Sequence, residues 1–159
     1  MALEIQTINF EKYNQEKDIV QNLAKSIWTR PESYENIIHS IERWANNKES
    51  GNYFYILQDG QKIGLTGYWP IRNDVGSFGL RHHGTTIKGT GKQALSLLVQ
   101  YLHENNSDSF KQLIELIPKD KEELIPVFEN WGFKLDPNGV PDWEPKKDYY
   151  KYSMIKKLD

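Results

Sequence analysis

The sequence contains no cysteine among its 159 residues. That absence excludes a disulfide scaffold, a thiolate zinc site and a cysteine nucleophile. No apolar run approaches the roughly 20 residues that a membrane span needs, and the first six residues have neither the basic nor the apolar region of a signal peptide. We therefore expect a cytoplasmic protein that does not bind membranes.

An excess of charge of one sign is also missing, because 20 Lys and Arg stand against 22 Asp and Glu, a net charge of -2. This balance disfavours a general nucleic-acid binder. Hydrophobic residues make up 38%, but aromatic residues reach 13%, so large rings are expected to supply much of the core. The length suits a single domain spanning residues 1–159.

Hydrophobic periodicity predicts an α+β fold, in which about four helices flank a mixed, largely antiparallel twisted sheet of about six to seven strands. Asp59-Gly60 predicts a tight hairpin turn. Strands are expected at 3–10, 53–57, 63–71, 76–83, 112–117 and 149–155, and helices at 19–28, 34–45, 92–103 and from about 120 to 131. A long ordered loop is expected at 136–148.

Three local features refine this pattern. Asp120 and Glu123 are expected to form a capping box for the last helix, Pro126 to bend that helix, and Gly132 to end it. Strict alternation along the fourth strand would place Arg81 and His83 on one face and His82 on the other.

The segment Lys88-Gly89-Thr90-Gly91-Lys92 links the fourth strand to the strongest predicted helix. Glycines allow close approach of a ligand to the backbone, a helix start presents unpaired N–H groups, and two lysines add positive charge. A pyrophosphate is the ligand that suits this arrangement, although the same glycines also suit a plain turn. The spacing matches neither a P-loop nor a dinucleotide fingerprint.

Two motifs resemble the GNAT superfamily of N-acetyltransferases. Thr86-Ile87-Lys88-Gly89-Thr90-Gly91 matches the cofactor loop of that family, Gln/Arg-x-x-Gly-x-Gly/Ala, except at its first position. Phe128-Glu129-Asn130-Trp131-Gly132-Phe133 is similar to a late family motif, Tyr-Glu-x-x-Gly-Phe. The order of predicted elements agrees with the family along essentially the whole chain, so the resemblance implies a GNAT-like acyltransferase fold.

The resemblance implies acetyl-CoA as the donor. Its pyrophosphate would lie on the amides of Lys88, Gly89, Thr90, Gly91 and Lys92, and its pantetheine arm would pair with the strand edge at Leu80, Arg81 and His82. Phe128 stands where the family often has a tyrosine that protonates the leaving thiolate, and Thr86 replaces the usual Gln or Arg.

Acetyl transfer to an ammonium requires a base. In the resembled fold, His82 and His83 would lie where the fourth strand meets the thioester, and histidine titrates near neutral pH. Of the two, His82 is the favoured candidate. Glu115 on the fifth strand is the second candidate, and Tyr150 could supply the proton that Phe128 lacks. Each of the three could instead have a purely structural role, as a hydrogen-bonded or packed side chain.

The sequence thus predicts an N-acetyltransferase that forms a ternary complex of acetyl-CoA with a primary amine on a small molecule or peptide, and that needs no metal. The alternative is a non-catalytic acyl-CoA-binding or regulatory domain that kept the fold, for which Thr86 and Phe128 are the grounds. A protein-interaction module without a cofactor is a third option. The acceptor amine is left open, as is whether the protein forms a homodimer.

Overall fold

The computed structural model describes residues 2–106 and 110–157, and the chain divides into two compact units. Unit 1 comprises residues 1–69 and 81–101, and unit 2 comprises residues 70–80 and 102–159. That the 159 residues act as a single domain stays a prediction. In the described part of the chain no helix is long and apolar enough to cross a membrane.

In the residues that the structure describes, seven strands form one open mixed sheet in the order β1-β2-β3-β4-β5-β7-β6, and four α-helices accompany it, which confirms the predicted fold class. The helices are α1 (Tyr13–Ile27), α2 (Pro31–Asn47), α3 (Gly91–Asn105) and α4 (Ile125–Asn130), with short 3-10 helices η1 (Phe10–Lys12) and η2 (Glu122–Leu124). The strands are β1 (Leu3–Thr7), β2 (Asn52–Gln58), β3 (Gln61–Pro70), β4 (Ser77–Thr85), β5 (Gln112–Pro118), β6 (Lys134–Leu135) and β7 (Tyr150–Lys157).

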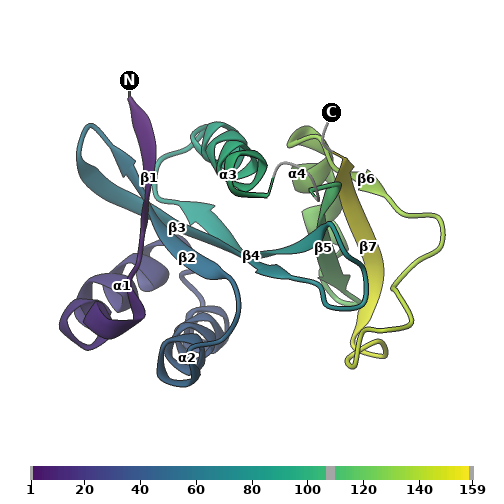
Figure 1. The fold of residues 1–159 in the computed structure, drawn as a ribbon, viewed down its shortest axis with the longest axis horizontal. Coiled ribbons are helices and arrows are strands. Elements are labelled where there is room, and N and C mark those ends of the chain that lie inside the picture. The colour runs from purple at the N-terminus through teal and green to yellow at the C-terminus, as the bar shows by residue number, and fades with distance from the viewer. Residues whose placement is uncertain (1, 107–109, 158–159) are drawn as a thin grey trace. The chain divides into compact units, whose positions relative to one another are not determined.

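Within unit 1, helices α1 and α2 lie on one face of strands β1–β3 and α3 lies on the other (Figure 1). Alternation along β2 explains the arrangement, because Tyr53 and Tyr55 pack with α1 and α2 while Ile56 packs with Ala94 of α3. Trp44 of α2 is fully buried and meets Tyr53 edge to face, with ring centroids 5.0 Å apart. Large rings therefore fill this core, as the composition predicted.

The hairpin between β2 and β3 turns at Asp59 and Gly60, as predicted. Both residues have positive φ, 49° and 83°, which the primed two-residue turn requires. The register that follows pairs Gln58 with Gln61. This turn fixes which face of β3 receives Leu65.

Unit 2 is built on the antiparallel pair β5 and β7, with Leu113, Ile117 and Met154 fully buried. The start of β4 joins it through a short parallel ladder, in which Ser77–Gly79 pairs with Gln112–Ile114.

Two local predictions for α4 are wrong. Lys121, and not Asp120, is the N-cap of η2, and no side chain caps it. Pro126 lies in the first turn of α4, where its missing N–H has no helical partner to lose, so it starts the helix and does not bend it. Gly132 does end the helix, with φ 94° and a bond from the Phe133 N–H to the Phe128 carbonyl of 3.0 Å.

Gly84 of β4 provides a test of the packing in unit 1. A Cβ at this position would lie 2.6 Å from Cγ2 of Ile27 and 3.0 Å from Cζ2 of Trp28. Gly84→Ala is expected to lower the free energy of unfolding by about 1–3 kcal/mol, measured by urea denaturation. The same change should cost less in an Ile27→Ala background, where the nearest methyl is gone. Equal stability of Gly84→Ala and the parent would contradict this packing.

Candidate active site

The side chains of strand β4 stop alternating between the two faces of the sheet at His82. The backbone of His82 is left-handed, with φ 37°, a conformation uncommon for a residue with a side chain. The Arg81 guanidinium lies over the Tyr53 ring, 5.5 Å from its centroid, and the His82 ring stacks on the same tyrosine. Arg81 and His82 therefore share the α1/α2 face, and the prediction that Arg81 lies with His83 is wrong, because strict alternation holds only where every residue is extended.

His82 lies among aromatic rings and is partly exposed. Its ring is nearly parallel to Tyr53, at 4° and 6.1 Å, and is edge-on to Trp28 at 6.4 Å. Burial, followed by the charges of Arg81 and Arg43, lowers the pKa of His82 to about 4. The imidazole is therefore neutral at physiological pH.

His83 points to the opposite face and ties β4 to the start of α3. Its Nε2 lies 2.7 Å from the Gly91 carbonyl oxygen, and its Nδ1 lies 2.8 Å from Oγ1 of Thr66. Since a carbonyl only accepts, Nε2 carries the proton and the neutral Nδ1 accepts from the threonine hydroxyl. Burial lowers the pKa of His83 to about 4, against the opposing effect of the Gly91 bond. With both nitrogens engaged, His83 has a structural role.

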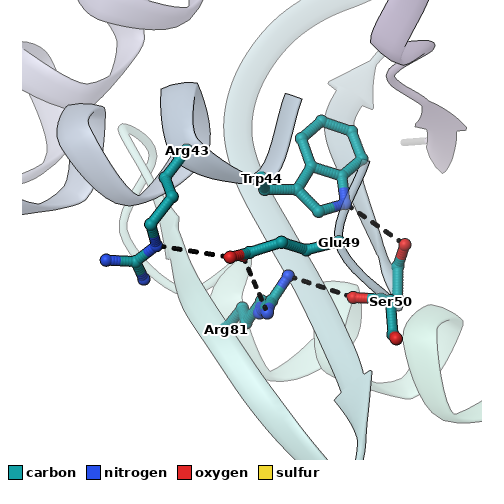
Figure 2. Close-up of polar contacts among 6 residues, drawn as sticks. Arg43, Trp44, Glu49, Ser50 and Arg81 are labelled. Carbon is teal, nitrogen blue, oxygen red and sulfur yellow. Dashed lines mark hydrogen bonds and ion pairs between the residues drawn. The ribbon is translucent and has the colours of Figure 1, made fainter. Parts of the chain in front are cut away.

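Arg81 connects β4 to the turn that follows α2 (Figure 2). Its guanidinium donates to the Ser50 carbonyl at 3.3 Å and lies 3.9 Å from the Glu49 carboxylate, which also pairs with Arg43 at 3.4 Å. The Trp44 indole N–H donates to the Gly51 carbonyl in the same turn, at 3.2 Å. These contacts hold the turn against the strand that carries His82.

The loop from Thr86 to Thr90 is stabilised from within. The buried Thr90 hydroxyl donates to the Ile87 carbonyl at 2.6 Å and lies 2.7 Å from the Thr85 hydroxyl. Gly89 has φ 87°, so a glycine is favoured there. Gly91 is the first residue of α3 and has no positive φ. Of the two loop glycines, only Gly89 is required by the backbone.

The N-terminus of α3 offers unpaired donors. Ala94 is the first helical residue whose N–H bonds back, to the Thr90 carbonyl at 2.9 Å. The earlier N–H groups of the first turn have no partner within the helix, and the positive end of the helix dipole lies there. Lys88 and Lys92 are exposed on either side. This end of α3 suits an anion.

In unit 2, the charge of Glu115 acts on the ionisation of Tyr150. Both are partly exposed. Burial raises the pKa of Glu115 to about 8. The pKa of Tyr150 is raised by burial first and then by the charges of Glu144 and Glu115. At neutral pH both groups mostly keep their protons.

Phe128 and Leu80 also belong to unit 2. Phe128 of α4 meets Trp131 and Phe133 edge to face, each at 5.4 Å, and Leu80 is buried. The structure thus gathers Arg81, His82 and residues 88–92 in unit 1, and Leu80, Glu115, Phe128 and Tyr150 in unit 2.

Sequence reasoning missed the residues that hold this site in place. Thr66 and Thr85 bind the histidine and the loop, and Glu49 binds the arginine. A polar residue inside an apolar strand, as Thr66 is, was the available signal.

The sequence matches no protein-family model and no curated protein, whereas solved structures match along nearly the whole chain. An aminoglycoside acetyltransferase AAC(6')-Ib in complex with coenzyme A and kanamycin has a TM-score of 0.69 at 14% identity, covering 98% of this chain and 95% of its own. A chimera of the spermidine N-acetyltransferase SpeG from Vibrio cholerae and hSSAT has 0.68 at 13%, covering 99% and 96%. A GNAT-family acetyltransferase from Staphylococcus aureus Mu50 has 0.66 at 16%, covering 99% and 100%.

An open mixed sheet whose fourth strand passes through a glycine loop into a helix is an α+β fold. The likeness to these structures makes it the GNAT acetyltransferase fold, as the two sequence motifs suggested.

The raised pKa of Glu115 predicts how stability changes with pH. Because the pKa is about 8 in the folded chain against an ordinary value of 4.5 for a glutamate side chain, the folded state binds more protons than the unfolded state between these two pH values. The protonated carboxyl therefore makes its full contribution to the free energy of unfolding below about pH 4.5. This contribution is lost as the pH rises towards 8. Glu115→Gln should be more stable than the parent at pH 8, by roughly 1 kcal/mol or more (about 2–4 °C in Tm), and this gain should shrink towards pH 5.

Thermal melts at a series of pH values measure this difference. Glu129→Gln, at an exposed position of α4, is the matched control for the change in net charge. A Glu115→Gln difference that does not vary between pH 5 and pH 8 would contradict the raised pKa.

Proposed function

We propose that the protein is an acetyl-CoA-dependent N-acetyltransferase that acts directly on a primary amine in a ternary complex. The observation that carries the proposal is the β4–loop–α3 segment, in which left-handed His82, left-handed Gly89 and the open N-terminus of α3 follow one another within a GNAT fold. The acceptor is proposed to be a small-molecule amine. In support, kanamycin and spermidine are named for two of the similar acetyltransferases.

The cofactor is proposed to bind with its pyrophosphate at the start of α3. Unpaired N–H groups and two exposed lysines suit an anion of this size, and similar structures contain coenzyme A. The ladder between β4 and β5 consists of only three pairs, ending at Gly79. The backbone of Leu80, Arg81 and His82 after that point is proposed to pair with the pantetheine amides.

Thr86 and Phe128 are the two positions at which the sequence departs from the family pattern. The hydroxyl of Thr86 donates to the Ile63 carbonyl at 3.1 Å, so this residue serves the fold of the loop. Phe128 has no proton to donate. Tyr150, whose raised pKa keeps its hydroxyl protonated, is proposed to protonate the leaving thiolate.

The pKa values favour Glu115 over His82 as the base. An alkylammonium has a pKa near 10.4, so proton transfer to a group of pKa about 8 spans about 2 pKa units, or roughly 3 kcal/mol. Transfer to His82, with a pKa of about 4, spans about 6 pKa units, or roughly 9 kcal/mol. We therefore propose Glu115 as the base. His82 is proposed to shape the cofactor edge of β4.

The first test of this proposal is calorimetric titration with acetyl-CoA of the parent, Gly89→Ala and Gly60→Ala. The two glycines have φ of 87° and 83°, and a Cβ meets nothing within 4 Å at either. Both substitutions therefore carry the same backbone strain. Gly89→Ala should weaken binding at least tenfold, about 1.4 kcal/mol, because it changes the ligand loop. Gly60→Ala should leave the affinity unchanged.

Equal affinity in the two folded variants would remove the loop from the cofactor site. Absence of binding to the folded parent would remove acetyl-CoA altogether.

The second test is the pH dependence of kcat, measured with acetyl-CoA and a panel of primary amines. If Glu115 is the base, kcat should rise with an apparent pKa of about 8 as the carboxyl ionises. Glu115→Gln should lower kcat by roughly 10²- to 10⁴-fold and abolish that pH step. His82→Ala should keep the step. The opposite result, with the step lost in His82→Ala and retained in Glu115→Gln, would make the histidine the base.

The alternative is a domain that binds acyl-CoA without catalysis, and the observation that favours it is the pair of departures at Thr86 and Phe128. Tight binding of acetyl-CoA with no turnover of any amine in the panel is the outcome that would select this alternative.

A further inference from the structure

A cavity of about 410 Å³ lies within unit 2, on the side of β5 and β7 that the segment from Asp136 to Lys147 covers. Gln112 and Ile114 of β5 line its floor. Since these residues alternate along the strand with Glu115, the cavity opens on the face opposite to that carboxyl. It is therefore separate from the group proposed as the base.

Ser153 of β7 gives the floor a buried polar group. It pairs across the sheet with Leu116, and Ile155 pairs with Ile114, so cross-strand pairing places Ser153 on the cavity face. Its side chain is 0% exposed, and among the described residues its hydroxyl has no hydrogen-bond partner. A buried hydroxyl without a partner is costly. A ligand in the cavity that donates a hydrogen bond would remove that cost.

Most of the charged side chains that line the cavity are acidic. Asp74, Asp136 and Asp142 line the cavity together with one cation, Lys147, which pairs with Asp142. Asp74 accepts from the Ser77 hydroxyl at 2.7 Å, and Asp136 accepts from the Asn138 N–H at 2.9 Å. In the described residues neither of these two carboxylates has an ion pair. The cavity thus has two negative charges that no cation balances.

The remaining walls decide which kind of cation fits. In the parts of the chain that the structure describes, no group of three or more acidic or histidine side chains is arranged to hold a metal ion. Ile114, Val140, Trp143 and Ile155 instead line the space between the acids. Apolar walls suit a methylene chain, an aromatic ring suits an ammonium, and the volume is that of a small-molecule site.

We propose that this cavity binds a small organic cation with primary ammonium groups, of the class of the aliphatic diamines, held by Asp74, Asp136 and the Ser153 hydroxyl. This binding needs no acetyl-CoA, so it stands or fails apart from the proposed acetyl transfer.

The test is calorimetric titration of the full chain, without acetyl-CoA, with 1,4-diaminobutane and 1,5-diaminopentane, and with 1,5-pentanediol as the uncharged control. Saturable binding of at least one diamine is expected, with none of the diol. Asp136→Asn should weaken binding at least tenfold, about 1.4 kcal/mol. Asp148→Asn, an exposed change directly after this segment and outside the cavity, should change it less than twofold.

Ser153→Ala tests whether the Ser153 hydroxyl contacts the ligand or only stabilises the fold. Because the hydroxyl has no partner among the described residues, its removal should leave Tm unchanged or raise it, while weakening diamine binding about threefold. No saturable binding by either diamine to the folded parent would overturn the proposal. So would equal weakening by Asp136→Asn and Asp148→Asn, or loss of stability in Ser153→Ala without loss of affinity.

Discussion

The left-handed backbone of His82 inside strand β4 is the constraint on which the rest of unit 1 depends. Such a residue costs of order 1–3 kcal/mol and persists only where its surroundings hold it. Here Arg81 is fixed to the turn after α2, the His82 ring packs between Tyr53 and Trp28, and His83 binds Thr66 and the start of α3. The strand therefore turns a different side chain to each helical layer, and the loop that follows starts from a fixed point.

Burial determines which titratable side chains carry a proton in both units. It lowers the pKa values of His82 and His83, so both rings are neutral, and it raises those of Glu115 and Tyr150, so both mostly keep their protons. An acetyl transfer needs a group that takes a proton from an ammonium and another that returns one to a thiolate. The ionised form of a carboxyl with a pKa near 8 is a stronger base for the first task than an imidazole with a pKa near 4, and a protonated tyrosine can supply the proton for the second.

Features determined by neighbouring residues could be predicted from the sequence. The Asp59-Gly60 turn, the amphipathic helices and the loop into α3 follow from local periodicity and from glycine chemistry. The facing of Arg81 could not, because it depends on a backbone flip that tertiary contacts hold. The prediction of a helix cap at Asp120 was wrong because α4 begins only at Ile125, with Pro126 in its first turn. The pKa of Glu115 and the unsatisfied Ser153 hydroxyl depend on strands and a loop that meet only in the folded chain.

The central claim is that the β4–loop–α3 segment holds the cofactor, and amide chemical shifts of the isotope-labelled chain during titration with coenzyme A test it most directly. The account predicts that the N–H signals of residues 88–93 move first and furthest, because the pyrophosphate contacts these amides, and that those of Leu80, Arg81 and His82 move with the same affinity. If the amides at the start of α3 stay unchanged while the ligand saturates, or if the shifts cluster elsewhere, the claim is wrong.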